Sequence, residues 1–214
     1  MTIRFLIIIC GLTFLLLTGA PVEAQTMNSV PQAVAAIYAE AEAFQKAGRL
    51  IDAASSYEKA VKIQPELAET YLRLGIVYFK LNVPGKAEEF YLKAINLGLD
   101  TGDVFFQLGY VLEVRGELQQ ALTYYLKAEE KGLHNPELFY NIGNTYARLE
   151  KLADAVSYYK RVVSINPMHM DAFVNLSVVS FQMQQKADAL FYLDKAVKLG
   201  YKAPVQYLKV LESK

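Results

Sequence analysis

The chain has 214 residues, and its 22 basic residues balance its 22 acidic residues. A net charge of zero excludes the strong global field with which basic proteins gather nucleic acid or anionic membranes. One Cys and two His exclude a disulfide framework and a Cys-rich zinc site, and they leave little for acid–base catalysis. A composition that is 53% apolar, with 15 Tyr and 11 Phe, indicates a folded chain. We therefore predict a binding function, with no catalytic residues, no cofactor and no metal.

Residues 1–24 have the layout of a secretory signal peptide. Arg4 precedes an apolar core over residues 5–17, and small residues precede a cleavage expected before Gln25. This core is shorter than the ~20 residues that a comfortable membrane span needs. The alternative is an uncleaved anchor over residues 3–20. The protein is expected outside the cytoplasm, periplasmic or secreted, or attached to a membrane only through this segment.

Residues 25–33 are expected to be a linker and the start of the first helix, and a repeat of 34 residues follows without insertion or deletion. The five units are 34–67, 68–101, 102–135, 136–169 and 170–203. Three columns at this spacing are Ala53, Ala87, Ala121, Ala155 and Ala189; Tyr57, Tyr91, Tyr125, Tyr159 and Leu193; and the small residues Ala41, Gly75, Gly109, Gly143 and Ser177.

Each unit contains two stretches with apolar residues at helical spacing. In the fourth unit, Phe139, Ile142, Gly143 and Tyr146 share one helical face, and a second such face begins at Ala155. Glu150 and Lys151 separate the two stretches in this unit, where other units have Gly or Pro, and Gly or Pro residues close the units. Short helices with one apolar face bury it only by stacking, so the sequence predicts helical hairpins packed in a row. The small columns are expected to allow close approach of the two helices, with aromatic rings filling the gaps between units.

At these residues the sequence resembles the tetratricopeptide repeat family over residues 34–203. It departs from that family in lacking the Trp that usually opens the first helix, and its first unit has Glu40 and Ala41 in place of Leu–Gly. The resemblance implies an all-α fold, a right-handed superhelical solenoid of five helix-turn-helix repeats. Residues 204–214 look like the extra helix that caps such solenoids at the C-terminus.

The resemblance also implies a concave groove lined by the first helix of each unit. Transferred to this sequence, its lining comprises Tyr38, Glu42, Leu72, Ile76, Phe79, Phe106, Tyr110, Glu113, Tyr140, Asn144, Val174, Val178 and Phe181, with the carboxylates Asp103, Glu137 and Asp171. This set is apolar and acidic, and an exposed surface of that kind favours an interaction site. The alternative is that the superhelix buries these residues itself.

Three amides, Asn141, Asn144 and Asn175, stand apart from the apolar set. A carboxamide donates and accepts hydrogen bonds at once, so it can pair with the backbone of an extended peptide. The alternative is that these amides bond within the hairpins. One clamp known in the family grips a C-terminal carboxylate with two Asn and several basic residues, but the basic members are missing here. Recognition of chaperone tails is therefore not expected.

The function predicted from the sequence is a non-enzymatic protein–protein interaction scaffold, exported from the cytoplasm. Its groove would bind a peptide or an amphipathic helix with an apolar face and possible basic flanks. One alternative is a self-assembling structural subunit of an envelope complex, which would make the protein a homo-oligomer. Another is an RNA-binding helical repeat protein, but that function needs a basic concave face. We therefore expect no nucleic acid among the partners.

Overall fold

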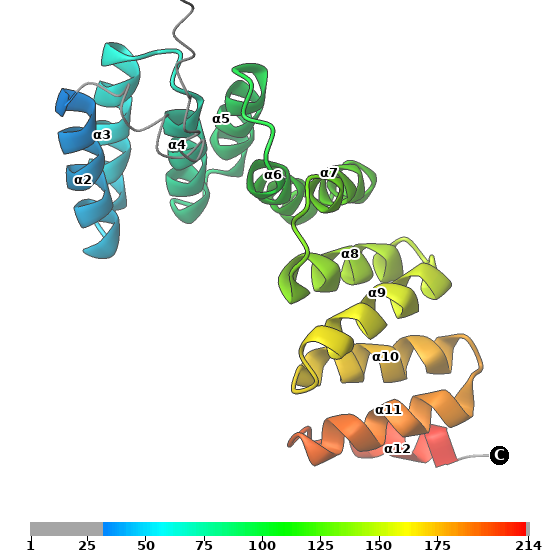
Figure 1. Cartoon of the computed structure of the whole chain (residues 1–214). Helices are drawn as coiled ribbons and strands as arrows, with labels where there is room; N and C mark the ends of the chain where they lie inside the picture. The colour runs from blue at the N-terminus through cyan, green and yellow to red at the C-terminus, as the bar shows by residue number, and fades with distance from the viewer. Residues whose placement is uncertain (1–31, 213–214) are drawn as a thin grey trace, which may run out of the picture.

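A computed structural model describes residues 32–212, which form an all-α solenoid (Figure 1). The predicted signal peptide and its cleavage site lie outside the described residues. The helices are α2 (Gln32–Lys46), α3 (Leu50–Ile63), α4 (Ala68–Lys80), α5 (Pro84–Asn96), α6 (Gly102–Val114), α7 (Leu118–Glu130), α8 (Pro136–Arg148), α9 (Leu152–Ile165), α10 (Met170–Gln182), α11 (Lys186–Lys198) and α12 (Val205–Glu212). Between residues 32 and 212, no helix is long and apolar enough to span a bilayer.

Consecutive helices pair into five hairpins, α2–α3, α4–α5, α6–α7, α8–α9 and α10–α11. Each hairpin also packs against the next one, through α3 with α4, α5 with α6, α7 with α8 and α9 with α10. Figure 1 shows the hairpins following one another along an arc, from α2 at one end to α12 at the other. The expected all-α solenoid of helix-turn-helix units is confirmed.

The turn inside each hairpin contains one residue in the left-handed region of backbone space. These residues form another column at the repeat spacing: Gly48, Asn82, Gly116, Glu150 and Gln184, with φ between 59° and 82°. Glycine adopts such a φ without steric cost, whereas a residue with a Cβ does not. In three of the five turns, the residue with positive φ is Asn82, Glu150 or Gln184, whose side chain disfavours that conformation. The rest of the hairpin therefore holds these turns in place.

The recurring tyrosine packs inside its own hairpin. Tyr57, Tyr91, Tyr125 and Tyr159 are almost completely buried. A Cβ added at Gly109 would lie 2.7 Å from the Tyr125 ring, so the glycine column makes room for this side chain. In the last hairpin Ser177 replaces the glycine and Leu193 replaces the tyrosine. The column expected to fill gaps between units thus fills the space between the two helices of one unit.

A second aromatic column covers the junction of the paired helices. Phe105 of α6 stacks with Tyr124 of α7, with ring centroids 6.3 Å apart, and Lys127 lies over both rings. In the next hairpin Arg161 lies 3.7 Å from the ring centroid of Phe139. These rings belong to a core that runs without a break from α4 to α10. The solenoid therefore has a continuous core along most of its length.

Helix α12 covers part of the last hairpin. Leu211 is completely buried beside Ala189 and Leu193, and the Tyr207 hydroxyl lies 2.8 Å from the Ser177 hydroxyl. With only 8 residues, α12 is shorter than the helices that begin units two to five. Apolar side chains of α11 accordingly remain exposed, namely Leu190, Phe191 and Val197.

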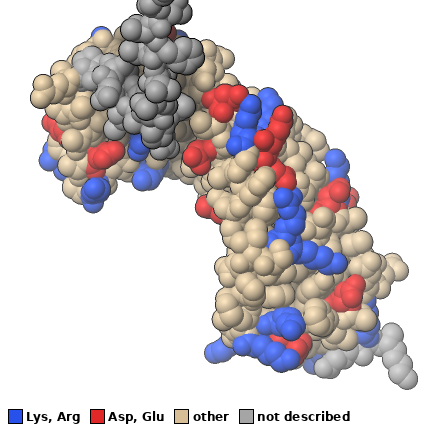
Figure 2. All heavy atoms as spheres, viewed as in Figure 1, with Lys and Arg blue, Asp and Glu red and all other residues tan. Residues whose placement is uncertain are grey.

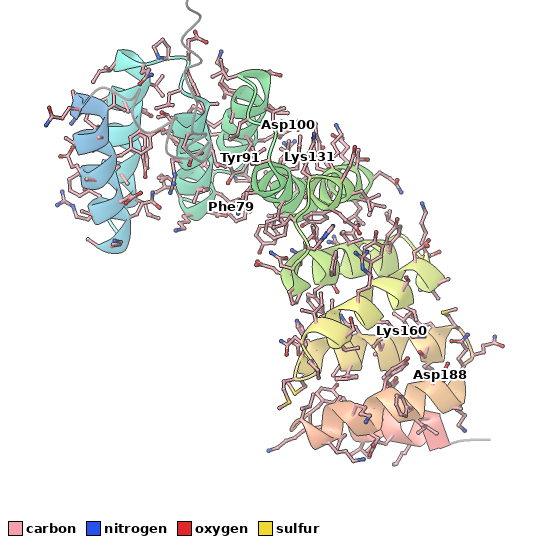
Figure 3. All side chains as sticks on the ribbon, viewed as in Figure 1. Phe79, Tyr91, Asp100, Lys131, Lys160 and Asp188 are labelled. Carbon is pink, nitrogen blue, oxygen red and sulfur yellow. The ribbon has the colours of Figure 1, made fainter. Side chains whose placement is uncertain are left out.

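Charged side chains of both signs are interspersed on the face shown in Figure 2, with apolar and neutral surface between them. Several form ion pairs between neighbouring hairpins: Arg73 with Glu42, Arg115 with Glu88, Lys131 with Asp100, Arg148 with Glu113 and Arg161 with Glu129. The Lys131–Asp100 pair is visible in Figure 3. Exposed pairs of this kind add little stability, so the apolar core carries the fold.

Candidate functional site

The first helices of successive hairpins form the inner side of the arc. Helix α4 contacts α6 and α6 contacts α8, in addition to their contacts with the second helices. First helices that touch one another across a hairpin lie on the concave side of a curved stack, where spacing is shortest. This concave surface is the candidate functional site.

The predicted groove residues differ in burial and fall into three groups: exposed, partly buried and buried. Tyr110 and Val178 are the most exposed of the large apolar ones, at 39% and 37%, and Glu42 is also exposed. Leu72 and Phe106 are buried, each with 8% exposure, so they support the surface from below. The remaining residues are partly buried: Tyr38, Ile76, Phe79, Glu113, Tyr140, Asn141, Asn144, Val174, Asn175 and Phe181.

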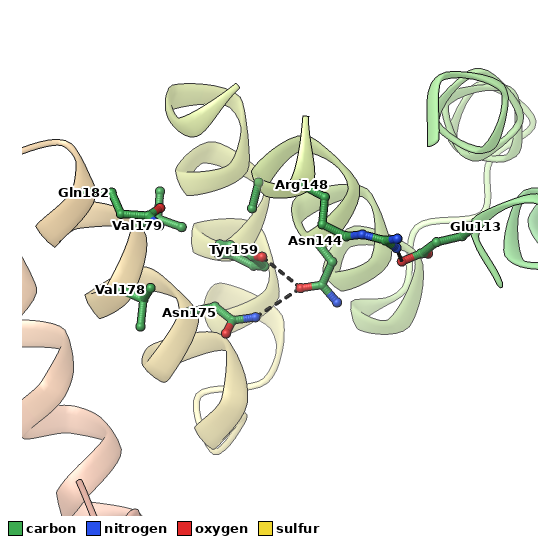
Figure 4. Close-up of a pocket in the computed structure, with 9 residues that line it drawn as sticks. Glu113, Asn144, Arg148, Tyr159, Asn175, Val178, Val179 and Gln182 are labelled. Atoms are coloured by element: carbon green, nitrogen blue, oxygen red, sulfur yellow. Dashed lines mark hydrogen bonds and ion pairs between the residues drawn. The ribbon is translucent and has the colours of Figure 1, made fainter. Parts of the chain in front are cut away.

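A depression of about 370 Å³ opens on this surface at the third, fourth and fifth hairpins. Its walls come from the first helices α6, α8 and α10, with one tyrosine contributed by α9 (Figure 4). The lining residues are Glu113, Asn144, Ala147, Arg148, Tyr159, Asn175, Val178, Val179 and Gln182. Four of them, Glu113, Asn144, Asn175 and Val178, belong to the set predicted from the sequence.

Two of the three predicted amides meet in this depression. Asn175 Nδ2 donates to Asn144 Oδ1 at 3.0 Å and to the Tyr140 hydroxyl at 3.2 Å. The Tyr159 hydroxyl donates to the same Asn144 Oδ1 at 2.8 Å. Asn144 Nδ2 and Asn175 Oδ1 take no part in these bonds, and in Figure 4 they lie at opposite ends of the amide pair, away from the bond between the two residues. The pair thus has one donor and one acceptor outside these bonds.

A charged group closes the depression toward the third hairpin. Arg148 Nη1 lies 3.1 Å from Glu113 Oε1, and the Tyr125 hydroxyl donates to Glu113 Oε2 at 2.7 Å. Burial, followed by the charge of Glu113, raises the pKa of Tyr125 far above its ordinary value. Tyr125 therefore stays protonated and remains a donor, which holds the Glu113 carboxylate in place.

Aromatic side chains continue the surface toward the N-terminal half. The ring centroid of Tyr110 lies 5.3 Å from that of Phe79 and 6.5 Å from that of Phe106, with the latter pair nearly parallel. Phe79 comes from α4 and the other two from α6, so the rings bridge two hairpins. Partly exposed rings provide contact area at small cost in conformational entropy.

The first two hairpins present a polar surface. The Tyr38 and Thr70 hydroxyls lie 2.6 Å apart, and Gln45 Nε2 donates to the Tyr57 hydroxyl at 3.1 Å. Burial raises the pKa of Tyr38 to about 12. Arg73 pairs with Glu69 at 2.8 Å in the same region. Its donors and acceptors are largely engaged with one another.

The two histidines lie apart from the depression. The ring of His169 lies 4.8 Å from that of Tyr140, and its Nδ1 accepts a hydrogen bond from the Ala172 backbone at the start of α10. His134 lies next to the α7 end, where it contacts the Glu129 carbonyl. Within residues 32–212, no three His, Cys, Asp or Glu side chains form a group that could hold a metal ion.

Sequence reasoning missed five residues that line the depression: Ala147, Arg148, Tyr159, Val179 and Gln182. Arg148 and Gln182 occupy equivalent places in α8 and α10, and Gln182 directly follows the predicted groove residue Phe181. Tyr159 was assigned to the core, and its ring does lie there, but its hydroxyl reaches the groove. The hydroxyl of Tyr159 could have predicted this role, since a buried phenol usually finds a hydrogen-bond partner.

Comparisons with known proteins agree with this architecture. Family models described as tetratricopeptide repeat match residues 136–169 and 68–97, and a model described as TPR repeat matches residues 41–82. No curated protein matches the chain.

Solved structures match most of the chain. The TPR protein YrrB, described as having an unusual peptide-binding site, is 28% identical and has a TM-score of 0.71, covering 83% of this chain and 91% of its own. MamA is 22% identical with a TM-score of 0.71, covering 79% and 96%. Pseudomonas aeruginosa pilF is 22% identical with a TM-score of 0.70, covering 85% of each chain. Tetratricopeptide repeats are therefore found in this chain, and its fold is that of the solenoids they build.

Proposed function

We propose that the protein is a non-enzymatic interaction scaffold that binds a peptide or an amphipathic helix on its concave surface. Proteins built from this repeat are typically interaction scaffolds without catalytic activity of their own. The observation that supports the proposal is the Asn144–Asn175 pair in the depression between α6, α8 and α10.

The pair suits a peptide backbone chemically. Asn144 Nδ2 can donate to a peptide carbonyl, and Asn175 Oδ1 can accept from a peptide N–H. The bond from Asn175 Nδ2 to the Tyr140 hydroxyl and the bond from the Tyr159 hydroxyl to Asn144 Oδ1 fix both carboxamides before a ligand arrives, which reduces the entropy lost on binding. Val178 offers apolar contact beside them. The site would therefore recognise a backbone segment followed by an apolar side chain.

Export is part of the proposal and rests on the signal layout of residues 1–24. The structures with similar folds include PilW, described as a type IV pilus biogenesis factor. Sequencing the N-terminus of the protein from an extracytoplasmic fraction tests this part. Gln25 as the first residue supports cleavage, whereas Met1 supports a retained anchor over residues 3–20.

Peptide selection tests the binding function directly. A displayed library of random peptides is selected on the immobilised full-length chain, and enriched peptides are titrated calorimetrically. Asn144→Ala and Asn175→Ala are each expected to weaken binding by about tenfold or more, because a buried backbone group loses its partner. The matched control is Asn96→Ala, an exposed amide at the end of α5. Failure to enrich any peptide, or equal losses in the control, contradicts the proposal.

Self-assembly is a second candidate function, favoured by the exposed side chains of Leu190, Phe191 and Val197 on α11. The four residues equivalent to Phe191 in the other hairpins are Ser55, Glu89, Thr123 and Ser157, all polar and exposed. Light scattering on the full-length chain gives the oligomeric state. If the chain self-associates through this end, Phe191→Ser should dissociate it. A monomeric wild-type chain excludes this function.

A further inference from the structure

A row of carboxylates lies along the first helices of four hairpins. Glu69, Asp103, Glu137 and Asp171 recur at intervals of 34 residues, each in the first turn of its helix. Glu69 is bound to Arg73. The other three are exposed, and none of them forms an ion pair with another described residue. We call Asp103, Glu137 and Asp171 the acidic row.

Two carboxylates of the acidic row, Glu137 and Asp171, contribute to the pKa of tyrosines at the concave surface. Besides burial and Glu113, the charge of Glu137 contributes to raising the pKa of Tyr125. The charge of Asp171 likewise adds to the effect of burial in raising the pKa of Tyr140. Both hydroxyls bond residues that line the depression, Glu113 and Asn175, so Glu137 and Asp171 lie close to it.

The basic residues of this region do not cancel the charge of these carboxylates. Arg148 is the one cation among the residues that line the depression, and Glu113 binds it. Over the whole of α6, α8 and α10 the acidic residues are Asp103, Glu113, Glu137 and Asp171, and the one basic residue is Arg148. A concave surface of low dielectric strengthens such an imbalance, because it focuses the field.

Helix capping alone does not account for the row. A carboxylate near a helix N-terminus is favourable, and this applies equally to first and second helices. At the equivalent first-turn place of the second helices, however, Lys86 and Gln120 interrupt the series Asp52, Asp154 and Asp188. On the first helices the series runs without interruption from α4 to α10, and only α2 departs from it, with Ala35 at the equivalent place.

We propose that the segment bound on the concave surface carries basic side chains along one edge, which pair with the acidic row, and apolar side chains along the other, which contact Tyr110 and Val178. This inference rests on the proposed function and names the chemistry of its partner. Charge complementarity supports it, since the carboxylates are exposed and unpaired, and Asp103 and Asp171 lie about two helical turns before Tyr110 and Val178 on the same helices.

The repeat also sets the spacing of the basic residues. Of the three helices that carry the acidic row, α6 contacts α8, and packed helices lie about 8–10 Å apart. An extended segment advances about 3.1–3.4 Å per residue. A basic residue at every third position would therefore meet one carboxylate per hairpin.

Three synthetic peptides test this pattern by fluorescence anisotropy with the full-length chain. The first has about twelve residues with Lys at every third position and Leu or Ala between, long enough to span four hairpins. The second has Glu in place of each Lys, and the third has the composition of the first with its Lys residues adjacent. The first peptide is expected to bind, with an affinity that falls as salt is added, and the third to bind more weakly. The second is expected not to bind.

Two matched triple variants locate the contact. D103N/E137Q/D171N removes the acidic row and should weaken binding of the first peptide by about tenfold or more. E89Q/E130Q/D154N removes the same charge from exposed places on second helices and should leave the affinity unchanged. Circular dichroism confirms that both variants are folded.

Several outcomes overturn the inference. They are equal binding of the acidic and basic peptides, wild-type affinity in the row variant, and an equal loss in the control variant. Library peptides that bind through Asn175 but lack basic residues also overturn it, while the proposed function stands. If no peptide of any class binds, the inference and the proposed function both fail.

Discussion

The second and third hairpins have the same internal packing but different hydroxyl environments. In the third hairpin the Tyr125 hydroxyl donates to Glu113. In the second hairpin Tyr91 fills the equivalent space between α4 and α5 (Figure 3), and its buried hydroxyl has no partner among the described residues. The cause lies on the first helix, where Phe79 occupies the place that Glu113 has one repeat later.

This difference shows that the ring and the hydroxyl of the recurring tyrosine have separate roles. The tyrosine ring is required by the shape of the hairpin, because it lies against the glycine of the first helix. The hydroxyl is used only where the first helix supplies a polar partner, as Glu113 does for Tyr125 and Asn144 does for Tyr159. The polar character of the concave surface can therefore change from one hairpin to the next while the core stays the same.

The largest expected effect is the loss of stability in alkaline solution. Burial raises the pKa of Tyr91 and Tyr125 above the ordinary value of 10.0. Below that value both states are protonated and stability is complete; above it the unfolded state loses protons and stability falls. Each such tyrosine contributes about 1.4 kcal/mol per pH unit. Urea unfolding at a series of pH values above 10 should show this fall, and Tyr91→Phe and Tyr125→Phe should reduce its slope equally.

Gly109→Leu should have the next largest effect. The new Cβ would lie 2.7 Å from the Tyr125 ring and 3.2 Å from the Ala121 carbonyl oxygen, so the hairpin would be overpacked. The expected cost is about 1–3 kcal/mol of unfolding free energy, measured by urea denaturation. Gly85→Ala is the control, since nothing lies within 4 Å of an added Cβ there. An unchanged midpoint for Gly109→Leu would contradict the packing role of the glycine column.

The smallest expected effect is the difference in stability at neutral pH between variants that lack one or the other hydroxyl. Tyr125→Phe removes one donor from the partly buried Glu113, which Arg148 still binds, and should cost about 0.5–1.5 kcal/mol. Tyr91→Phe removes a hydroxyl that has no partner, so it should be neutral or slightly stabilising. Thermal unfolding of the two variants is the measurement. Equal losses would show that the hydroxyl environments of the two hairpins do not differ in solution.

The fold could be predicted from the sequence because the same pattern of residues recurs in every repeat. A single hairpin gives an ambiguous signal, but the tyrosine, alanine and small-residue columns keep their spacing over all five units. The columns could not show that Tyr125 packs within its hairpin and not between hairpins. That distinction depends on the direction of a side chain, which spacing along the chain does not contain.

The candidate site could be predicted only as a surface. Register placed Asn144 and Asn175 on the same face, but the choice between bonding a partner and bonding each other depends on a 3.0 Å contact between residues 31 apart. The structure shows that one atom of each carboxamide bonds internally. Arg148 was missed because the predicted groove residues of the other hairpins end at Phe79, Glu113 and Phe181, one place before the one that Arg148 holds in its own hairpin. Its contact with Glu113, 35 residues away, follows from the curvature of the stack.

The left-handed turns have a consequence for engineering. Asn82, Glu150 and Gln184 hold a positive φ that the equivalent Gly48 and Gly116 adopt freely. For residues with a Cβ, this conformation costs about 1–2 kcal/mol, least for Asn. The thermal stability of the solenoid can therefore be increased at three solvent-exposed positions, none of which lines the depression. A more heat-resistant version of the scaffold can be built from these turns without altering a residue that a ligand would touch.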